Sequence, residues 1–507
     1  MFGIAEDKKM NNRGEITIYL LLILLILLSL VGAVYCGVIV ELGGARVDTV
    51  AAGLEEHLLA DYQRELFERY HMLALDTTYG SGSEAGLEEL AVDYLEDNLG
   101  ADNVFSYKIE EVLLEDYDTL LKDNCREFQR QMKRDLLFHG GDFVFQKLLQ
   151  DSQSMCMVPV GGKESKKGFG EKTDVGEDAY ETEIDVDALV SKLELQKEWE
   201  EVVTELLSSN LMKTVYGSKA LPRKEKIVLE HVPSHTRKES FQTKICTIKN
   251  REDLRQWMKE AKNTSVSLDT ILNRGVELAY AGTHFTNALT EDIGEEQHSF
   301  KLEQEYLIAG KANDYDNANR VLTMLGFLRF VQNYQALKQD KAKQQELELY
   351  ATAISMLLEQ PQAKDGIKEL LGGMWSYMES ITDLKLLMRG EKVPLDKGGN
   401  EWNTELLDLI SVKYVEGKGY DTGLDYGQYL MVLMGLFVPE KTFNLRMLDV
   451  MQLNISTEGY EADLNRFATA ITMSGSIRQT GNWNYRINEK RLLYHFRKEA
   501  GYENDTE

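Results

Sequence analysis

The chain has 507 residues, of which 84 are acidic and 57 are basic, so its formal net charge is −27 at pH 7. Binding to DNA, RNA or anionic lipid headgroups depends on Lys and Arg side chains that neutralise phosphate, so this acidic excess excludes a nucleic-acid partner from our expectations. The four cysteines, at positions 36, 125, 156 and 246, lack the close spacing of a zinc site and do not resemble a disulfide framework, although the sequence leaves a single disulfide open.

An uninterrupted apolar run from Ile16 to Val40 is the first predicted element. At about 1.5 Å of rise per residue, a helix of this length extends ~37 Å and crosses a hydrocarbon core of about 30 Å with some tilt. Helix is expected because every backbone polar group in hydrocarbon must be paired within the segment. A cleaved signal peptide with Val31-Gly32-Ala33 as its cleavage site is the alternative, but the apolar run continues well past Ala33. We therefore predict a retained transmembrane helix over 16–40.

The distribution of basic residues around this run predicts its orientation. Lys8, Lys9 and Arg13 precede it, whereas Arg46 is the only Lys or Arg between positions 41 and 60. Because Lys and Arg near the ends of a span favour the cytoplasmic side, residues 1–15 are expected in the cytoplasm. The chain is therefore predicted to be a single-pass protein of the cell membrane with its main domain extracellular.

A long amphipathic helix is predicted to continue directly from the transmembrane helix. Apolar residues recur every three or four positions from Val47 to Tyr70, with acidic residues between them. Glycine costs up to about 1 kcal/mol in a helix interior, so Gly43-Gly44 predicts a bend. Further helices are expected over 87–99 and 112–149.

The fold class predicted for the whole chain is mainly α, with a small β-hairpin-like part near the C-terminus. Long periodic stretches and only six prolines favour helix, and the Gly-rich, charged composition of 161–183 is typical of a flexible linker. In chain order, the expected segments are a cytoplasmic N-terminus (1–15), the transmembrane helix (16–40), the amphipathic helix with a first helical unit (41–160), the linker (161–183), a mixed helical and extended segment (184–250), a helical bundle (251–455) and a hairpin-like tail (456–507).

Within these segments the periodicity predicts individual elements. The bundle is expected to contain helices over 253–262, 268–289, 317–339, 345–359, 367–388, 427–435 and 442–453. Trp375 and Tyr377 are expected in its core because they lie in an apolar helical pattern. The tail is expected to contain strands over 467–477 and 483–487, joined by a turn at 479–481.

Two patterns resemble metal sites without satisfying them. His231 and His235 have the spacing of zinc ligands on a helix, but Pro233 argues against a helix and no Glu follows the first His. They are interpreted as solvent-facing loop histidines. Residues 313–319 look like a calcium loop, but Ala318 and Asn319 stand where an oxygen ligand and Gly are needed, so helix capping before Val321 is expected instead.

Motifs for catalysis are missing from the sequence. It contains no GxSxG, no Walker A pattern and no GxGxxG that follows a strand. Paired carboxylates occur throughout so acidic a chain, and no pair stands out as an acid and base couple. We therefore name no catalytic, cofactor-binding or metal-binding residue, and we expect no enzymatic activity and no cofactor.

Residues 13–20, with the sequence RGEITIYL, resemble the start of TadE/TadG-like minor pilins of tight-adherence (Tad) pilus systems. In those proteins a Gly after a basic residue precedes an apolar helix that anchors a small exterior domain. Pilin-type processing after Gly14 favours Glu at the fifth following position, where this chain has Tyr19.

A second resemblance covers nearly the whole chain. It rests on the residues 41–46 (ELGGAR), 59–70 (LADYQRELFERY), 75–76 (LD), 302–310 (LEQEYLIAG), 392–395 (KVPL) and 445–455 (LRMLDVMQLNI). These segments resemble an uncharacterised family of membrane-anchored proteins from clostridial Gram-positive bacteria, a domain of unknown function whose members are commonly encoded near Tad-like pilus genes. The resemblance implies a role in or beside a pilus or secretion apparatus, by association.

Three functional hypotheses follow. The first is a non-enzymatic bitopic component or accessory of a Tad-like, type IV-related pilus or secretion apparatus, with the lipid bilayer and apparatus proteins as partners. The second is a stand-alone surface receptor, adhesin or scaffold protein. The third is an unrecognised hydrolase of envelope material, which would need a concave site with a convergent cluster of His or carboxylate side chains that have perturbed pKa values.

Overall fold

The computed structural model describes residues 12–80, 82–100, 105–139, 211–237, 274–290, 298–398, 401–411, 416–457, 459–480 and 492–502. The chain divides into two compact units. Unit 1 comprises Met1–Phe67, Leu73–Lys122 and Asn465–Glu507, and unit 2 comprises Glu68–Met72 and Asp123–Leu464. The predicted mainly α fold, with one long apolar N-terminal helix and a small antiparallel sheet, is confirmed.

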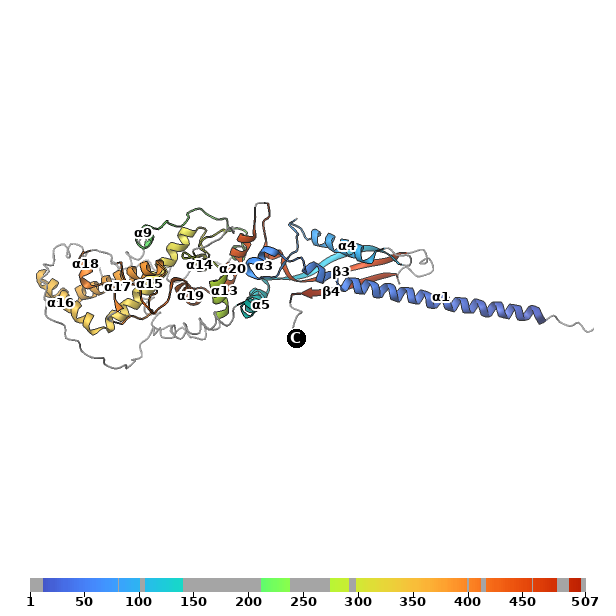
Figure 1. Cartoon of the computed structure of the whole chain (residues 1–507), viewed down its shortest axis with the longest axis horizontal. Helices are drawn as coiled ribbons and strands as arrows, with labels where there is room; N and C mark the ends of the chain where they lie inside the picture. Colours follow the sequence, from blue (N-terminus) through green and yellow to red (C-terminus); the bar gives the residue numbers. More distant parts are fainter. Residues whose placement is uncertain are drawn as a thin grey trace, which may run out of the picture. The chain divides into compact units, whose positions relative to one another are not determined.

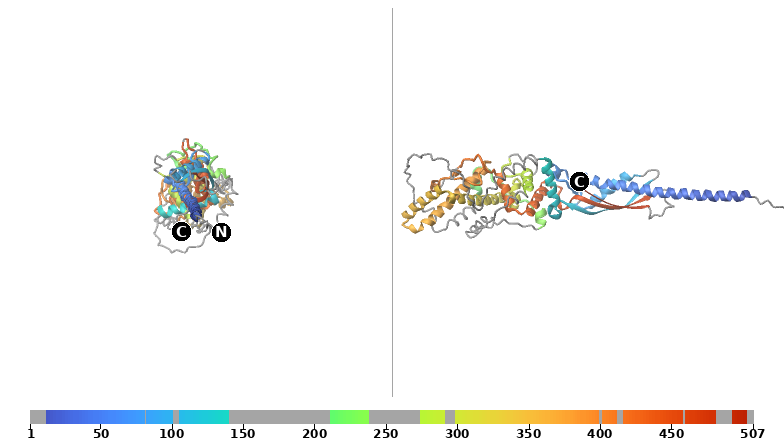
Figure 2. Two further views of the ribbon diagram at one scale, coloured as in Figure 1. Left: turned by 90° about the vertical axis from the view of Figure 1, so that its right-hand side faces the viewer. Right: turned by 90° about the horizontal axis from the view of Figure 1, so that it is seen from below.

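Helix α1 (Asn12–Ala52) is one continuous helix of 41 residues (Figures 1 and 2). Within the described part of the chain, it contains the single candidate for a membrane span by length and composition. Its large apolar side chains from Ile16 to Val38 are exposed on all sides, whereas Ile39, Val47 and Ala51 are buried along one face. The helix surface thus changes from apolar all round to amphipathic near residue 39.

The expected bend at Gly43-Gly44 is wrong, because α1 runs through both glycines without a break. A close contact with the sheet of unit 1 explains why a glycine, which has no side chain, stands at position 43. A Cβ atom added at Gly43 would lie 2.5 Å from Gln479 Oε1 and 2.9 Å from Tyr494 Oη. Gly43 therefore leaves room for the side chains of Gln479 and Tyr494 against the helix, and the propensity cost that predicted a bend is offset by this packing.

The amphipathic helix expected to reach Tyr70 is divided into three pieces. Helix α1 ends at Ala52, and α2 (Leu54–Leu59) and α3 (Arg64–Tyr70) follow. Gly53 separates the first two, and a Cβ atom there would lie 2.8 Å from Tyr94 Oη. Between α2 and α3 the backbone N–H of Gln63 donates to the carbonyl oxygen of Ala74, so the chain leaves the helix to pair with a later segment.

An antiparallel sheet forms the other half of unit 1 (Figure 1). Its strands are β1 (Leu75–Asp76), β2 (Ser106–Thr119), β3 (Phe467–Thr480) and β4 (Leu493–Gly501). The long strand β3 pairs with each of the other three. Apolar residues of α1, α2 and α4 (Ala85–Leu99) pack with those of β2, β3 and β4 in one core. Unit 1 is therefore a helical layer on a sheet whose strands come from both ends of the chain.

The helix expected over 112–149 is wrong for its first part, because residues 112–119 belong to β2. Helix α5 follows at Lys122–His139, with left-handed backbone at Asp123, Asn124 and Cys125 before its regular part. The hairpin-like tail is present as β3 and β4, but β4 begins at Leu493. The strand expected over 483–487 lies outside the described residues, as do the linker over 161–183 and the helix over 253–262.

Unit 2 is helical in its described residues. Its remaining elements are α9 (Leu211–Tyr216), α10 (Pro233–Thr236), α13 (Gly275–His284), α14 (Glu303–Ala309), α15 (Asp314–Gln339), α16 (Lys341–Leu357), η2 (Pro361–Ala363), α17 (Lys364–Met388), α18 (Leu406–Ser411), α19 (Tyr426–Phe437) and α20 (Glu440–Ile455). The short helix η4 (Leu464–Arg466) begins at the last residue of unit 2 and leads into β3 of unit 1. Helix α17 packs against α15 and α16 at the centre of this bundle (Figure 1). Trp375 and Tyr377 are buried there, as predicted.

Helix caps explain where several of these helices begin. The Asn313 side chain accepts a hydrogen bond from the backbone N–H of Asp316 at 2.7 Å, which confirms that residues 313–319 start a helix. Asp340 caps α16 in the same way, and Asp425 with Gln428 forms a capping box at α19. Each cap satisfies a backbone donor that the first turn of a helix would leave without a partner.

The close contact at Gly43 gives a testable prediction. We expect G43L to push α1 away from β3 and β4 at a cost of about 1–3 kcal/mol, because a well-packed contact resists added volume. Gly32 lies on the same helix with no atom within 4 Å of an added Cβ, so G32L is the matched control. Amide hydrogen exchange of β4 in the full chain in detergent should be faster in G43L and unchanged in G32L. Equal exchange in the two variants would contradict the packing role of Gly43.

Candidate functional site

The histidine pair singled out from the sequence lies on the surface of unit 2. His231 and His235 are both exposed, in agreement with the solvent-facing interpretation. The argument that Pro233 excludes a helix is wrong, because Pro233 is the first residue of α10, and His235 lies within that helix. Proline is tolerated at the first helical position, where its missing N–H would have no intrahelical partner.

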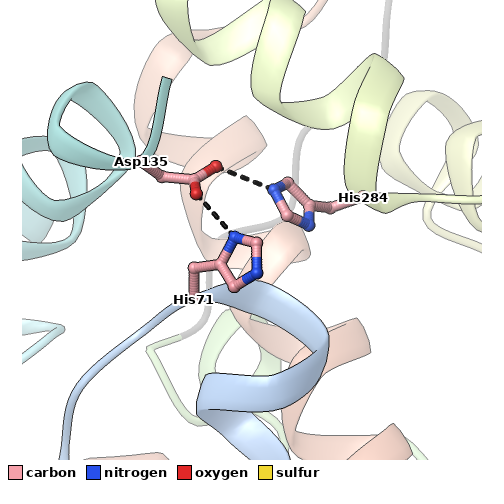
Figure 3. A group of neighbouring side chains, drawn as sticks. All are labelled: His71, Asp135 and His284. Atoms are coloured by element: carbon pink, nitrogen blue, oxygen red, sulfur yellow. Dashed lines mark hydrogen bonds and ion pairs between the residues drawn. The ribbon is translucent and has the colours of Figure 1, made fainter. Parts of the chain in front are cut away.

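A different group of side chains converges inside unit 2, and it was missed in the sequence. His71, Asp135 and His284 lie so that one ligand atom of each is within 4.8 Å of the others. Figure 3 shows the Asp135 carboxylate between the two imidazole rings. His71 follows the end of α3, Asp135 lies on α5, and His284 is the last residue of α13. We call this group the His–Asp–His cluster.

The Asp135 carboxylate contacts one histidine with each of its oxygen atoms. Oδ1 lies 2.6 Å from His71 Nδ1, and Oδ2 lies 2.8 Å from His284 Nε2. Burial alone would raise the pKa of Asp135, but the hydrogen bonds from His284 and His71 outweigh it and hold that pKa below its usual range. Asp135 is therefore an anion at neutral pH, and it is almost completely buried.

The hydrogen bonds of His284 determine its protonation. Its Nδ1 lies 3.1 Å from the carbonyl oxygen of Arg69, and a carbonyl oxygen only accepts hydrogen bonds. Nδ1 must therefore carry a hydrogen atom, which in a neutral imidazole leaves a lone pair on Nε2. That lone pair would face the anionic Oδ2 of Asp135. The contact is favourable only if a positive charge lies between the two atoms, either a proton on Nε2 or a metal cation.

The backbone and surroundings of the cluster limit how its side chains can move. His71 has a left-handed backbone with φ of 52°, a conformation in which histidine is enriched among non-glycine residues. The Tyr280 ring lies with its centroid 4.3 Å from that of His284, and its hydroxyl donates to the carbonyl oxygen of Tyr70 at 2.6 Å. The side chain of His71 is 30% exposed, whereas those of Asp135 and His284 are 3% and 9% exposed. The cluster is thus a largely buried site that reaches solvent through His71.

The cluster supplies convergent His and carboxylate groups, which are one part of what the hydrolase hypothesis requires, the other part being a concave site. Cys125, on the same helix as Asp135, does not supply a nucleophile: burial raises the pKa of its thiol to about 11, so it stays protonated at neutral pH. Two imidazoles and a carboxylate can hold a proton or bind a divalent metal ion. The arrangement therefore supports binding chemistry more directly than covalent catalysis.

A second group of polar residues, in the bundle, has a structural role. The guanidinium group of Arg329 pairs with Asp383, and the Lys397 ammonium contacts both Asp383 and Glu379. All four side chains are fully buried. Burial alone would raise the pKa of Asp383, but the charges of Arg329 and Lys397 lower it. Glu379 also accepts hydrogen bonds from the N–H and hydroxyl of Thr404, so the network links α15, α17 and the segment after α17.

Glu305 is a buried carboxylate without such compensation. Its Oε1 accepts hydrogen bonds from the Tyr426 hydroxyl and the Ala288 N–H, whereas its Oε2 is buried and has no hydrogen-bond partner among the residues that the structure describes. Burial raises the pKa of Glu305 to about 7 despite those hydrogen bonds. This carboxyl group therefore changes its charge near neutral pH, which makes the stability of unit 2 dependent on pH.

Residues 190–479 match the model of DUF5702, which is described as a family of unknown function. The chain belongs to this family. No curated protein and no solved structure matches it at a significant level. The matched segment contains Glu305, His284 and the buried charge network, whereas His71 and Asp135 precede it. The resemblance to a family of unknown function is confirmed at this level.

The raised pKa of Glu305 gives a prediction with a definite sign. A carboxyl group whose pKa is higher in the folded state stabilises the fold below its unfolded pKa of 4.5, and this contribution is lost as pH rises through about 7. The variant E305Q cannot ionise. We therefore expect its free energy of unfolding, minus that of the wild type, to be larger by about 3 kcal/mol at pH 8 than at pH 4, which means that E305Q is relatively more stable at pH 8.

The measurement is denaturant unfolding of the full chain in detergent at both pH values. Glu225 is exposed on unit 2, so E225Q is the matched control and should show no such change. The assignment fails if E305Q and E225Q shift equally between the two pH values.

Proposed function

We propose that this protein is a non-enzymatic component or accessory of a Tad-like, type IV-related pilus or secretion apparatus. It has a domain of unknown function and one N-terminal helix long and apolar enough to span a membrane, which fits a bitopic membrane protein. The proposal adds the orientation expected from Lys8, Lys9 and Arg13, with both compact units outside the cell.

The main support for the proposal is that α1 is one unbroken helix with an apolar first half and a second half that packs on the sheet of unit 1. Apolar side chains cover every side of its first half, and Ile23, Leu24 and Leu27 are each more than half exposed. Such a surface is stable in hydrocarbon or against apolar helices of other proteins, and not in water. The second half of the same helix packs on the sheet with no break at the junction.

An unbroken helix of this kind couples the membrane segment mechanically to a folded unit. A flexible linker would let the exterior unit move freely, whereas a continuous helix transmits its position and rotation in the membrane. The resemblance of residues 13–20 to TadE/TadG-like pilins implies the same plan, in which an apolar helix anchors a small exterior domain. These two arguments favour an assembly whose subunits pack through their membrane helices.

The test is site-specific photo-crosslinking in native membranes, with the chain expressed from its own locus. Leu42 on α1 is 55% exposed and lies just beyond the apolar half, so a crosslinker there samples neighbours of the membrane-proximal helix. Leu349 on α16 is 69% exposed and is the matched position in unit 2. We expect the crosslinker at position 42 to capture pilus platform or pilin-like proteins, identified by mass spectrometry, and position 349 to capture them less or not at all.

The opposite outcome supports the other hypothesis. Products with wall material alone, or none with apparatus proteins at either position, would contradict the proposal and favour a stand-alone surface receptor, adhesin or scaffold.

A further inference from the structure

We propose that His71, Asp135 and His284 bind one divalent transition-metal ion, and that Zn²⁺ fits them best. The donor set consists of two imidazole nitrogens and one carboxylate oxygen. Zinc takes these ligand types, and sites with three protein ligands leave a fourth position for water. The site lies within unit 2 and is independent of any role in a pilus.

The distances in the cluster are close to those of a zinc site. Zinc–ligand bonds of about 2.0–2.1 Å in a tetrahedral site place neighbouring ligand atoms roughly 3.3 Å apart. Asp135 Oδ1 and Oδ2 lie 2.6 Å and 2.8 Å from the nearest histidine nitrogens, and all three ligand atoms lie within 4.8 Å of one another. An ion between them therefore requires the two close oxygen–nitrogen pairs to separate by roughly 0.5–0.7 Å, and any other pair of ligand atoms to approach by at most about 1.5 Å.

The hydrogen bond from His284 Nδ1 to the Arg69 carbonyl oxygen is the second argument. Metal-binding histidines almost always donate their other ring N–H to a carbonyl or carboxylate, which fixes the tautomer and aims the free nitrogen at the ion. His284 shows this arrangement, with Nε2 directed at the cluster. The lone pair on Nε2 and the anionic carboxylate of Asp135 would repel each other. A metal ion between them would supply the positive charge that makes their contact favourable.

The burial of the three side chains and the access of solvent to them also suit a metal site. Asp135 and His284 are nearly buried, so water competes weakly for the ion, whereas the partly exposed His71 provides access from solvent. The three residues come from segments separated by 64 and 149 positions along the chain. A bound ion would therefore hold the segment Glu68–Met72 against α5 and α13 and stabilise unit 2.

The experiment uses the full chain in detergent, first treated with a chelator and then titrated with ZnCl₂ in competition with a chromophoric chelator. We expect one Zn²⁺ per wild-type chain and a rise in the midpoint of thermal unfolding. The variants H71N and H284Q should lose at least tenfold in affinity, since each removes a ligand. The double variant H231Q/H235Q removes two exposed histidines and should bind as the wild type does.

The choice of H71N keeps the test decisive. Asparagine accepts the left-handed backbone of position 71, and the side chain there is partly exposed, so this variant is expected to fold even if H284Q does not. Substitution of Co²⁺ provides a second measurement, because its visible absorption reports the ligand geometry. The proposal is overturned if the wild type binds no stoichiometric Zn²⁺ or if folded H71N binds it with wild-type affinity. The cluster would then be a hydrogen-bonded group with a proton on His284 Nε2.

Discussion

The continuity of α1 is the constraint on which the arrangement of unit 1 depends. A single helix must satisfy two environments, apolar on all sides up to Val38 and apolar on one face from Ile39 onward. The buried face of its second half lies on strands that come from residues 106–119 and from the last part of the chain. Because β3 and β4 complete this core, unit 1 cannot form until residues 467–501 have been synthesised.

Burial of charge in unit 2 places a different constraint on the fold. Two cations and two anions in the bundle compensate each other, and Thr404 satisfies a remaining acceptor. Such networks add little net stability over apolar packing, but removal of one partner leaves an uncompensated charge. Arg329 and Lys397 therefore specify how the helices and the segment after α17 fit together. Glu305, whose raised pKa makes its charge depend on pH, and the His–Asp–His cluster are further polar groups in the same unit.

The elements predictable from the sequence were those with a local signal. Helix α1, the bundle helices and the Asn313 cap follow from periodicity and capping residues close together in the chain. Strand β2 was mistaken for helix because register shifts after Ile109 and Leu114 add a residue each time, so its apolar side chains are two and then three positions apart. Apolar residues at this spacing are closer to the period of an amphipathic helix than to the strict alternation of a strand. The His–Asp–His cluster has no local signal at all, because its residues meet only through tertiary packing.

The central claim is that α1 is retained and anchors both units to the membrane, and fractionation of cells that express the native chain tests it most directly. The account predicts that the chain sediments with membranes in high salt and alkaline carbonate and dissolves only in detergent. Mass spectrometry of that fraction should recover peptides from residues 12–40. A chain found in the soluble or secreted fraction, with an N-terminus after Ala33, would contradict the account and show that the apolar run is a cleaved signal peptide.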